Sequence, residues 1–116
     1  MLGLITGSGF YDLPGLEDAV DRQVETPYGV VSLVYATWNG CPVVFLPRHG
    51  ADHSVPPQRI PYRANLWALH QAGARAVFAT AVSGGINPGY RNGELVLIDQ
   101  FINLTNGRDD TFFDEE

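Results

Sequence analysis

The chain has 116 residues, 45% of them hydrophobic, which suffices for one small domain with a buried core. Its formal net charge is −6, with seven arginines and no lysine, and this argues against a nucleic-acid groove, which needs a basic surface. No stretch approaches the ~20 apolar residues of a membrane span, and we expect no signal peptide. The single cysteine, Cys41, favours a reducing, cytoplasmic setting without disulfides.

The beginning of the chain predicts a short strand followed by turns. The apolar run 2–6 is typical of a buried strand, and it ends at the glycine loop 7–9. The Asp-Leu-Pro-Gly sequence at 12–15 predicts a turn. We expect residues 16–23 to be an acidic surface stretch.

A hairpin is the clearest local feature. After a turn at 26–29, the runs 30–38 and 42–46 are rich in β-branched and aromatic residues. Asn39 and Gly40 stand between these runs, and this dipeptide favours a tight hairpin turn. We therefore expect two antiparallel strands here.

A loop, a helix and a strand follow. Residues 50–59 are polar and contain two prolines, which keep them out of a helix interior. The apolar spacing after Pro61 predicts a helix to Ala72, ended by Gly73, and His70 is expected to face solvent. The strand predicted over 75–82 follows at once, so we expect the helix to pack against it.

The last third of the chain predicts one more strand. Residues 83–93 are rich in glycine and form a connection, and residues 94–102 have the apolar, β-branched composition of a strand. The tail 106–116 is acidic but contains Phe112 and Phe113, whose rings we expect to pack on another surface. Together these elements predict an α/β fold, a mixed twisted sheet with flanking helices.

Three of the predicted strands lead into loops suited to an anion. Ligands of α/β proteins bind where strands end, glycines let backbone N–H groups approach an oxyanion, and an arginine adds a two-pronged donor. The three loops are Thr-Gly-Ser-Gly at 6–9, Pro-Arg-His-Gly at 47–50 and Thr-Ala-Val-Ser-Gly-Gly at 80–85. They indicate phosphate as a ligand.

The second loop is the most informative. Arg48 can bind two oxygens of a phosphate, and His49 can add a hydrogen bond. The alternative is a surface salt bridge from Arg48 to one of the thirteen acidic residues. His53, in the same loop, is a candidate to lie beside the substrate.

Other site chemistries fit the sequence poorly. Asp52 with the two loop histidines matches no zinc signature, so we expect no metal. A serine hydrolase needs a Gly-x-Ser-x-Gly elbow, which is absent. A dinucleotide fingerprint needs a third glycine where Asp12 stands, and a P-loop needs a lysine.

Six motifs occur in order along the chain: Gly-Ser-Gly-Phe-Tyr at 7–11, Thr-Pro-Tyr-Gly at 26–29, Phe-Leu-Pro-Arg-His-Gly at 45–50, Tyr-Arg-Ala-Asn-Leu-Trp-Ala-Leu at 62–69, Ser-Gly-Gly-Ile-Asn-Pro at 83–88 and Leu-Ile-Asp-Gln-Phe-Ile-Asn-Leu-Thr at 97–105. Together they resemble one known family, the methylthioadenosine phosphorylase branch of the trimeric purine nucleoside phosphorylases. The resemblance covers essentially the whole chain.

The resemblance implies phosphorolysis, in which inorganic phosphate attacks the anomeric carbon of a purine nucleoside. It implies no cofactor, no covalent intermediate and no catalytic nucleophile of the protein. The bound phosphate is the co-substrate, and its charge stabilises a cationic, oxocarbenium-like transition state. A purine base and a 5-methylthioribose 1-phosphate are the implied products.

The resemblance also assigns a phosphate site. Ser8 matches the hydroxyl residue of the first loop, and Arg48 and His49 match an Arg-His phosphate pair. Ala81 and Val82 are placed where the family has Thr or Asn followed by Ala, so that this contact would rest on backbone N–H groups. The implied assembly is a homotrimer.

Family members are roughly twice this length, so residues 1–116 are interpreted as the N-terminal part of one phosphorylase domain. The nucleoside subsite is then expected mainly from a missing C-terminal half. Two alternatives stay open: an inosine or guanosine phosphorylase, and a non-catalytic fragment of such an enzyme.

Overall fold

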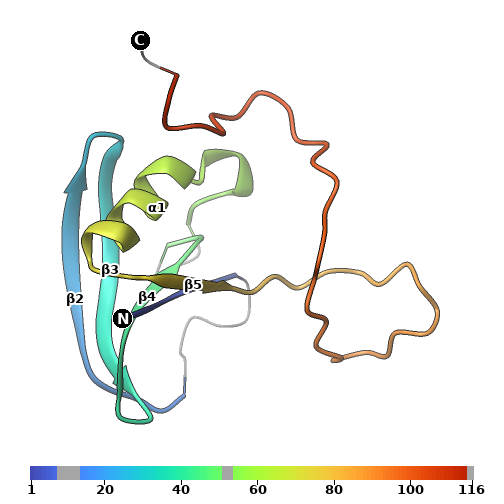
Figure 1. Cartoon of the computed structure of the whole chain (residues 1–116), viewed down its shortest axis with the longest axis horizontal. Helices are drawn as coiled ribbons and strands as arrows, with labels where there is room; N and C mark the ends of the chain where they lie inside the picture. The colour runs from blue at the N-terminus through green and yellow to red at the C-terminus, as the bar shows by residue number, and fades with distance from the viewer. Residues whose placement is uncertain (8–13, 51–53, 115–116) are drawn as a thin grey trace.

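The computed structural model describes residues 1–7, 14–50 and 54–114, and these form a mixed α/β structure. A five-stranded sheet has the order β2-β3-β4-β1-β5. Its strands are β1 (Leu2–Thr6), β2 (Leu16–Thr26), β3 (Gly29–Trp38), β4 (Cys41–Pro47) and β5 (Ala76–Ala79). A 3-10 turn, η1 (Pro57–Arg59), and one helix, α1 (Tyr62–Gln71), lie between β4 and β5 (Figure 1).

The sheet combines an antiparallel and a parallel part. β2, β3 and β4 form an antiparallel meander, and β1 pairs in parallel with both β4 and β5. The registers Thr6↔Pro47 and Ile5↔Ala79 bring the carboxyl ends of the three parallel strands to one edge. This edge is where an α/β sheet binds its ligands.

The predicted hairpin is confirmed, and the acidic stretch predicted at the surface over 16–23 is exposed, although the sequence did not predict that it forms a strand. Trp38 pairs with Cys41 around a turn in which Asn39 and Gly40 have positive φ. The acidic stretch is part of β2, whose backbone pairs with β3 although most of its side chains are exposed. Charged side chains on an edge strand prevent it from pairing with another chain. Because this composition is polar, it did not predict a strand.

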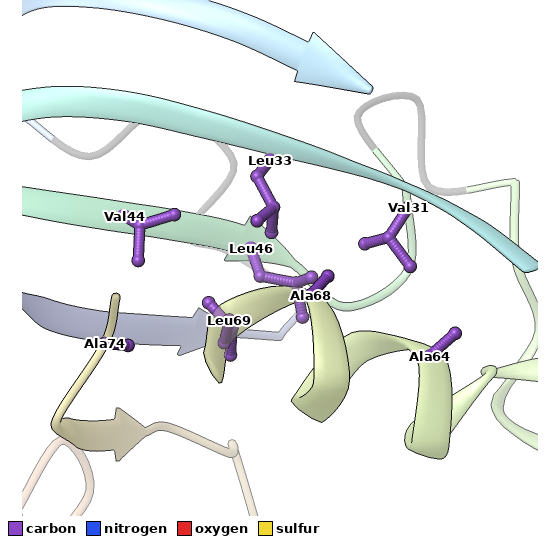
Figure 2. Close-up of a cluster of buried hydrophobic side chains, with 8 residues drawn as sticks. All are labelled: Val31, Leu33, Val44, Leu46, Ala64, Ala68, Leu69 and Ala74. Atoms are coloured by element: carbon purple, nitrogen blue, oxygen red, sulfur yellow. The ribbon is translucent and has the colours of Figure 1, made fainter. Parts of the chain in front are cut away.

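Helix α1 covers one face of the sheet. Ala64, Ala68 and Leu69 are almost completely buried and pack against the sheet (Figure 2). The sheet contributes Val31, Leu33, Val44 and Leu46 to this cluster. The helix contacts β3 and β2, so the expectation that it packs against the following strand is wrong. His70 is exposed, as predicted.

The opposite face of the sheet carries a second cluster of buried residues: Leu4, Ala36, Val43 and Phe45. Alternation along β4 sends Val43 and Phe45 to this face and Val44 and Leu46 to the helix face. The central strands are therefore buried on both sides, which explains their continuous apolar runs.

Residues 80–114 contain no helix or strand, so the prediction of a strand over 94–102 is wrong. Leu95 and Leu97 are 97% and 90% exposed. The composition of this segment favours a strand, but no described strand lies beside it to accept its backbone hydrogen bonds.

None of the described helices is long and apolar enough to cross a membrane.

Candidate anion site at the strand ends

Hydrogen bonds from both neighbouring strands fix the edge where β1, β4 and β5 end. The Arg48 backbone N–H donates to the Thr6 carbonyl at 3.0 Å, and the Thr80 N–H donates to the Ile5 carbonyl at 2.9 Å. The residues that follow β4 and β5 are thus hydrogen-bonded to the last residues of β1. Two of the three loops predicted from the sequence, those at 47–50 and 80–85, therefore meet the start of the loop at 6–9.

Gly7 and the Arg48 side chain are in close contact. A Cβ atom added to Gly7 would overlap Nη2 of Arg48 and would lie 3.6 Å from the Thr80 carbonyl oxygen. Gly7 is buried and Arg48 half-buried. The absence of a side chain at Gly7 therefore lets the guanidinium lie against the end of β1.

Arg48 is the cation of this cluster. In residues 1–7, 14–50 and 54–114 the ion pairs are Arg63 with Asp109 and Arg63 with Asp114, so Arg48 has no carboxylate partner there. The salt-bridge alternative thus finds no support in the described part of the chain. A guanidinium without a carboxylate partner has donors that can bind an anion.

His49 is only 7% exposed, and two reciprocal hydrogen bonds hold its loop. The Val55 N–H donates to the His49 carbonyl at 2.9 Å, and His49 Nδ1 lies 2.9 Å from the Val55 carbonyl. A carbonyl oxygen only accepts, so Nδ1 carries a proton in this contact. This contact holds the His49 ring against the Val55 backbone.

Thr80 is the residue that sequence reasoning missed. Its Oγ1 is the one buried side-chain polar atom without a hydrogen-bond partner in the described part of the chain. Such an atom needs an explanation, because buried polar groups are almost always satisfied. The available signal in the sequence was its position as the first residue after the strand.

The structure does not bring the other predicted site residues into this cluster. Ala81 is exposed and Val82 is 78% exposed, both beyond Thr80. Ser8 and His53 lie outside the described residues. Among the residues that the structure describes, no three histidines, cysteines or acids are grouped as metal ligands.

A parallel-strand edge with a glycine, an arginine and a buried hydroxyl defines a candidate anion site in an α/β fold. The model of one family, described as the phosphorylase superfamily, matches residues 1–116. The chain belongs to this superfamily.

Its curated relatives carry the names of nucleoside phosphorylases. The chain is 46% identical over 116 residues to the S-methyl-5'-thioadenosine phosphorylase of Pyrobaculum aerophilum, covering 97% of this chain and 41% of the relative. It is 49% identical to the enzyme of the same name from Mycolicibacterium smegmatis, covering 98% of this chain and 44% of the relative. It is 43% identical to the probable 6-oxopurine nucleoside phosphorylase of Thermococcus kodakarensis, covering 99% of this chain and 43% of the relative. The chain spans less than half the length of these relatives.

Solved structures agree with this assignment. Methylthioadenosine phosphorylase from Schistosoma mansoni, in complex with adenine, superposes with a TM-score of 0.62 at 41% sequence identity. The superposition covers 67% of this chain and 28% of that chain. A methylthioadenosine phosphorylase from an antarctic soil metagenomic library superposes with a TM-score of 0.61 at 39% sequence identity, covering 67% of this chain and 28% of that chain. The predicted mixed α/β fold of this family is therefore confirmed.

Proposed function

We propose that this chain forms the phosphate-binding part of a purine nucleoside phosphorylase that acts on 5'-methylthioadenosine. The observation that carries the proposal is the meeting of Gly7, Arg48 and Thr80 at the ends of three adjacent parallel strands. Relatives of the same superfamily named S-methyl-5'-thioadenosine phosphorylase support the choice of substrate.

In this proposal the protein positions phosphate and takes no covalent part in the reaction. The Arg48 guanidinium binds two phosphate oxygens, His49 orients the anion, and the Thr80 hydroxyl donates to a third oxygen. The backbone N–H groups near Ala81 and Val82 and the Ser8 hydroxyl complete the site. Thr80 thus provides the side-chain donor that Ala81 lacks.

The chemical step follows from this arrangement. A phosphate oxygen attacks the anomeric carbon while the bond from that carbon to the purine nitrogen breaks. The purine leaves with this electron pair, and the products are the free base and 5-methylthioribose 1-phosphate. The bound phosphate dianion lies beside the sugar as positive charge develops, which lowers the barrier electrostatically. No cofactor takes part.

The nucleoside side of the site is assigned to sequence beyond this chain. We propose that a C-terminal half, with His53 as a neighbour of the substrate, completes the pocket, and that the working assembly is a cytoplasmic homotrimer. By itself the chain should self-associate or bind a complementary chain, because Leu95, Leu97 and Phe113 are each at least 90% exposed. A monodisperse 12.7 kDa species with a cooperative melt would contradict this expectation.

A second candidate is a 6-oxopurine nucleoside phosphorylase, since relatives from Thermococcus kodakarensis and Pyrococcus furiosus carry that name at 43% and 42% identity. The two candidates differ in the group at the 5' position. A methylthio group needs an apolar pocket and a hydroxyl needs a buried polar partner, so a site built for one rejects the other.

Phosphorolysis assays test the proposal. The chain is assayed alone and together with a C-terminal half, and kcat/KM is compared for methylthioadenosine, methylthioinosine, adenosine and inosine. We expect activity only in the mixture and preference for methylthioadenosine. Preference for inosine would favour the second candidate, and inactivity of the mixture would favour a non-catalytic fragment.

A further inference from the structure

The last described segment of the chain returns to the α1 side of the sheet (Figure 1). Residues 108–114 are held there by side chains of α1 and of the turn between β2 and β3, and we call them the strap. The preceding residues 80–107 contain no helix or strand. The strap is therefore held by its own side-chain contacts and not by pairing with the sheet.

Arg63 on α1 makes the two ion pairs of the strap. Its Nη2 donates to Asp109 Oδ2 and its Nη1 donates to Asp114 Oδ2, each at 2.7 Å. Desolvation alone would lower the pKa of the Arg63 guanidinium, but the charges of Asp109 and Asp114 outweigh it and raise the pKa above its ordinary value. One guanidinium thus binds a carboxylate on either side of Phe112.

Phe112 is the apolar anchor between these two carboxylates. Its ring centroid lies 5.7 Å from that of Tyr28 and 6.3 Å from that of Trp67, and the Tyr28 and Trp67 rings are 5.9 Å apart. The Arg63 guanidinium also lies over the Tyr28 ring, 4.7 Å from its centroid. The neighbouring Phe113 is 92% exposed, so only Phe112 of the two phenylalanines packs against these rings.

The beginning of the strap forms one wall of a cavity of about 620 Å³. Arg108 lies over the Tyr62 ring and donates to its hydroxyl at 2.9 Å. Tyr28, Pro61 and Tyr62 also line this pocket. Movement of the strap would therefore remove one wall of this pocket and uncover the aromatic surface of Tyr28 and Trp67.

We propose that the strap is an electrostatic latch, which opens at high ionic strength while the sheet and α1 stay folded. The carboxylates of its ion pairs are exposed, with side-chain exposures of 69% for Asp109 and 40% for Asp114. Salt screens such pairs, since the Debye length falls from about 10 Å at 0.1 M to about 3 Å at 1 M. Neither core cluster contains a residue of the strap.

The two tryptophans allow a direct test by NMR on the full chain. Trp67 contacts the strap, whereas Trp38 packs against the cluster on the other side of the sheet and serves as an internal control. We expect a rise from about 0.1 M to about 1 M NaCl to shift the Trp67 indole N–H signal toward its position in the Phe112→Ala variant. The Trp38 signal should stay in place.

Substitutions distinguish the latch from a general salt effect. Arg63→Gln, and separately the double change Asp109→Asn with Asp114→Asn, should produce the open Trp67 signal already at low salt. Asp110→Asn is the matched control, since it removes a strap charge that takes part in no ion pair of the described residues. The proposal is overturned if the Trp67 signal ignores salt and both sets of changes, if Asp110→Asn acts equally, or if the Trp38 signal moves together with that of Trp67.

Discussion

The two parts of this chain, residues 1–79 and residues 80–114, both contain runs of apolar residues but differ in what they build. The first part buries Leu33 and Val44 completely between strands and helix. The second part has no regular structure and leaves Leu97 and Ile102 90% and 84% exposed. Apolar composition thus becomes a packed strand only where a neighbouring strand and a covering face are available. The candidate anion site lies where the two parts meet.

The largest expected effect separates the two parts by stability. Leu33→Ala removes a side chain with no exposed surface and should lower the free energy of unfolding by about 2–5 kcal/mol. Leu97→Ala makes the same chemical change at a 90% exposed position and should change it by about 0.5 kcal/mol or less. Urea unfolding measures both. Equal losses would mean that residues 80–114 are packed in solution.

A second prediction concerns the anion site. Arg48→Ala should weaken phosphate binding by about 1.5–3 kcal/mol, because a charge-assisted hydrogen-bonding group is lost. Arg75→Ala is the matched control: it removes the same charge at the opposite end of β5, where the Arg75 N–H bonds to the Met1 carbonyl. Calorimetric phosphate titration measures both variants. If Arg48→Ala keeps the affinity of the parent chain, Arg48 does not bind phosphate.

Gly7→Ala should act on the same site with a smaller effect. The new methyl group would overlap Nη2 of Arg48, the far end of a flexible side chain, so the guanidinium would move while the fold stays intact. We expect weaker phosphate binding than in the parent chain, a smaller loss than for Arg48→Ala, and an unchanged melting temperature. A large drop in melting temperature would instead indicate that Gly7 matters for folding.

Local patterns predicted the parts of the fold that depend on local chemistry. The Asn39-Gly40 turn and the helix between Pro61 and Gly73 follow from turn and capping preferences, and both are present. Strand β2 and the absence of a strand at 94–102 depend on pairing between distant segments, which composition does not encode. The same holds for the packing of α1 on β3.

In the candidate site, too, local residue types predicted some residues, and contacts between distant segments decide the rest. Arg48 and His49 were recognised by their residue types at the end of a strand, and they lie at the shared edge of the sheet. Thr80 was passed over in favour of Ala81 and Val82, because the resemblance placed the contact one residue later. Only the structure reveals that the Thr80 hydroxyl is buried without a partner.

The smallest expected effect, at Thr80, has opposite signs for folding and for binding. Thr80→Val keeps the shape of the side chain but removes a buried hydroxyl that has no partner within the described residues. Removing such a group relieves a desolvation cost, so the free energy of unfolding should rise by about 1 kcal/mol in the absence of phosphate. If the hydroxyl donates to phosphate, the same change should weaken phosphate binding by a similar amount. Thermal unfolding with and without phosphate measures both effects, and Thr80→Ser, which keeps the hydroxyl, is the control for binding. A valine variant that gains stability and keeps its phosphate affinity would remove Thr80 from the site and return the contact to the backbone beyond β5.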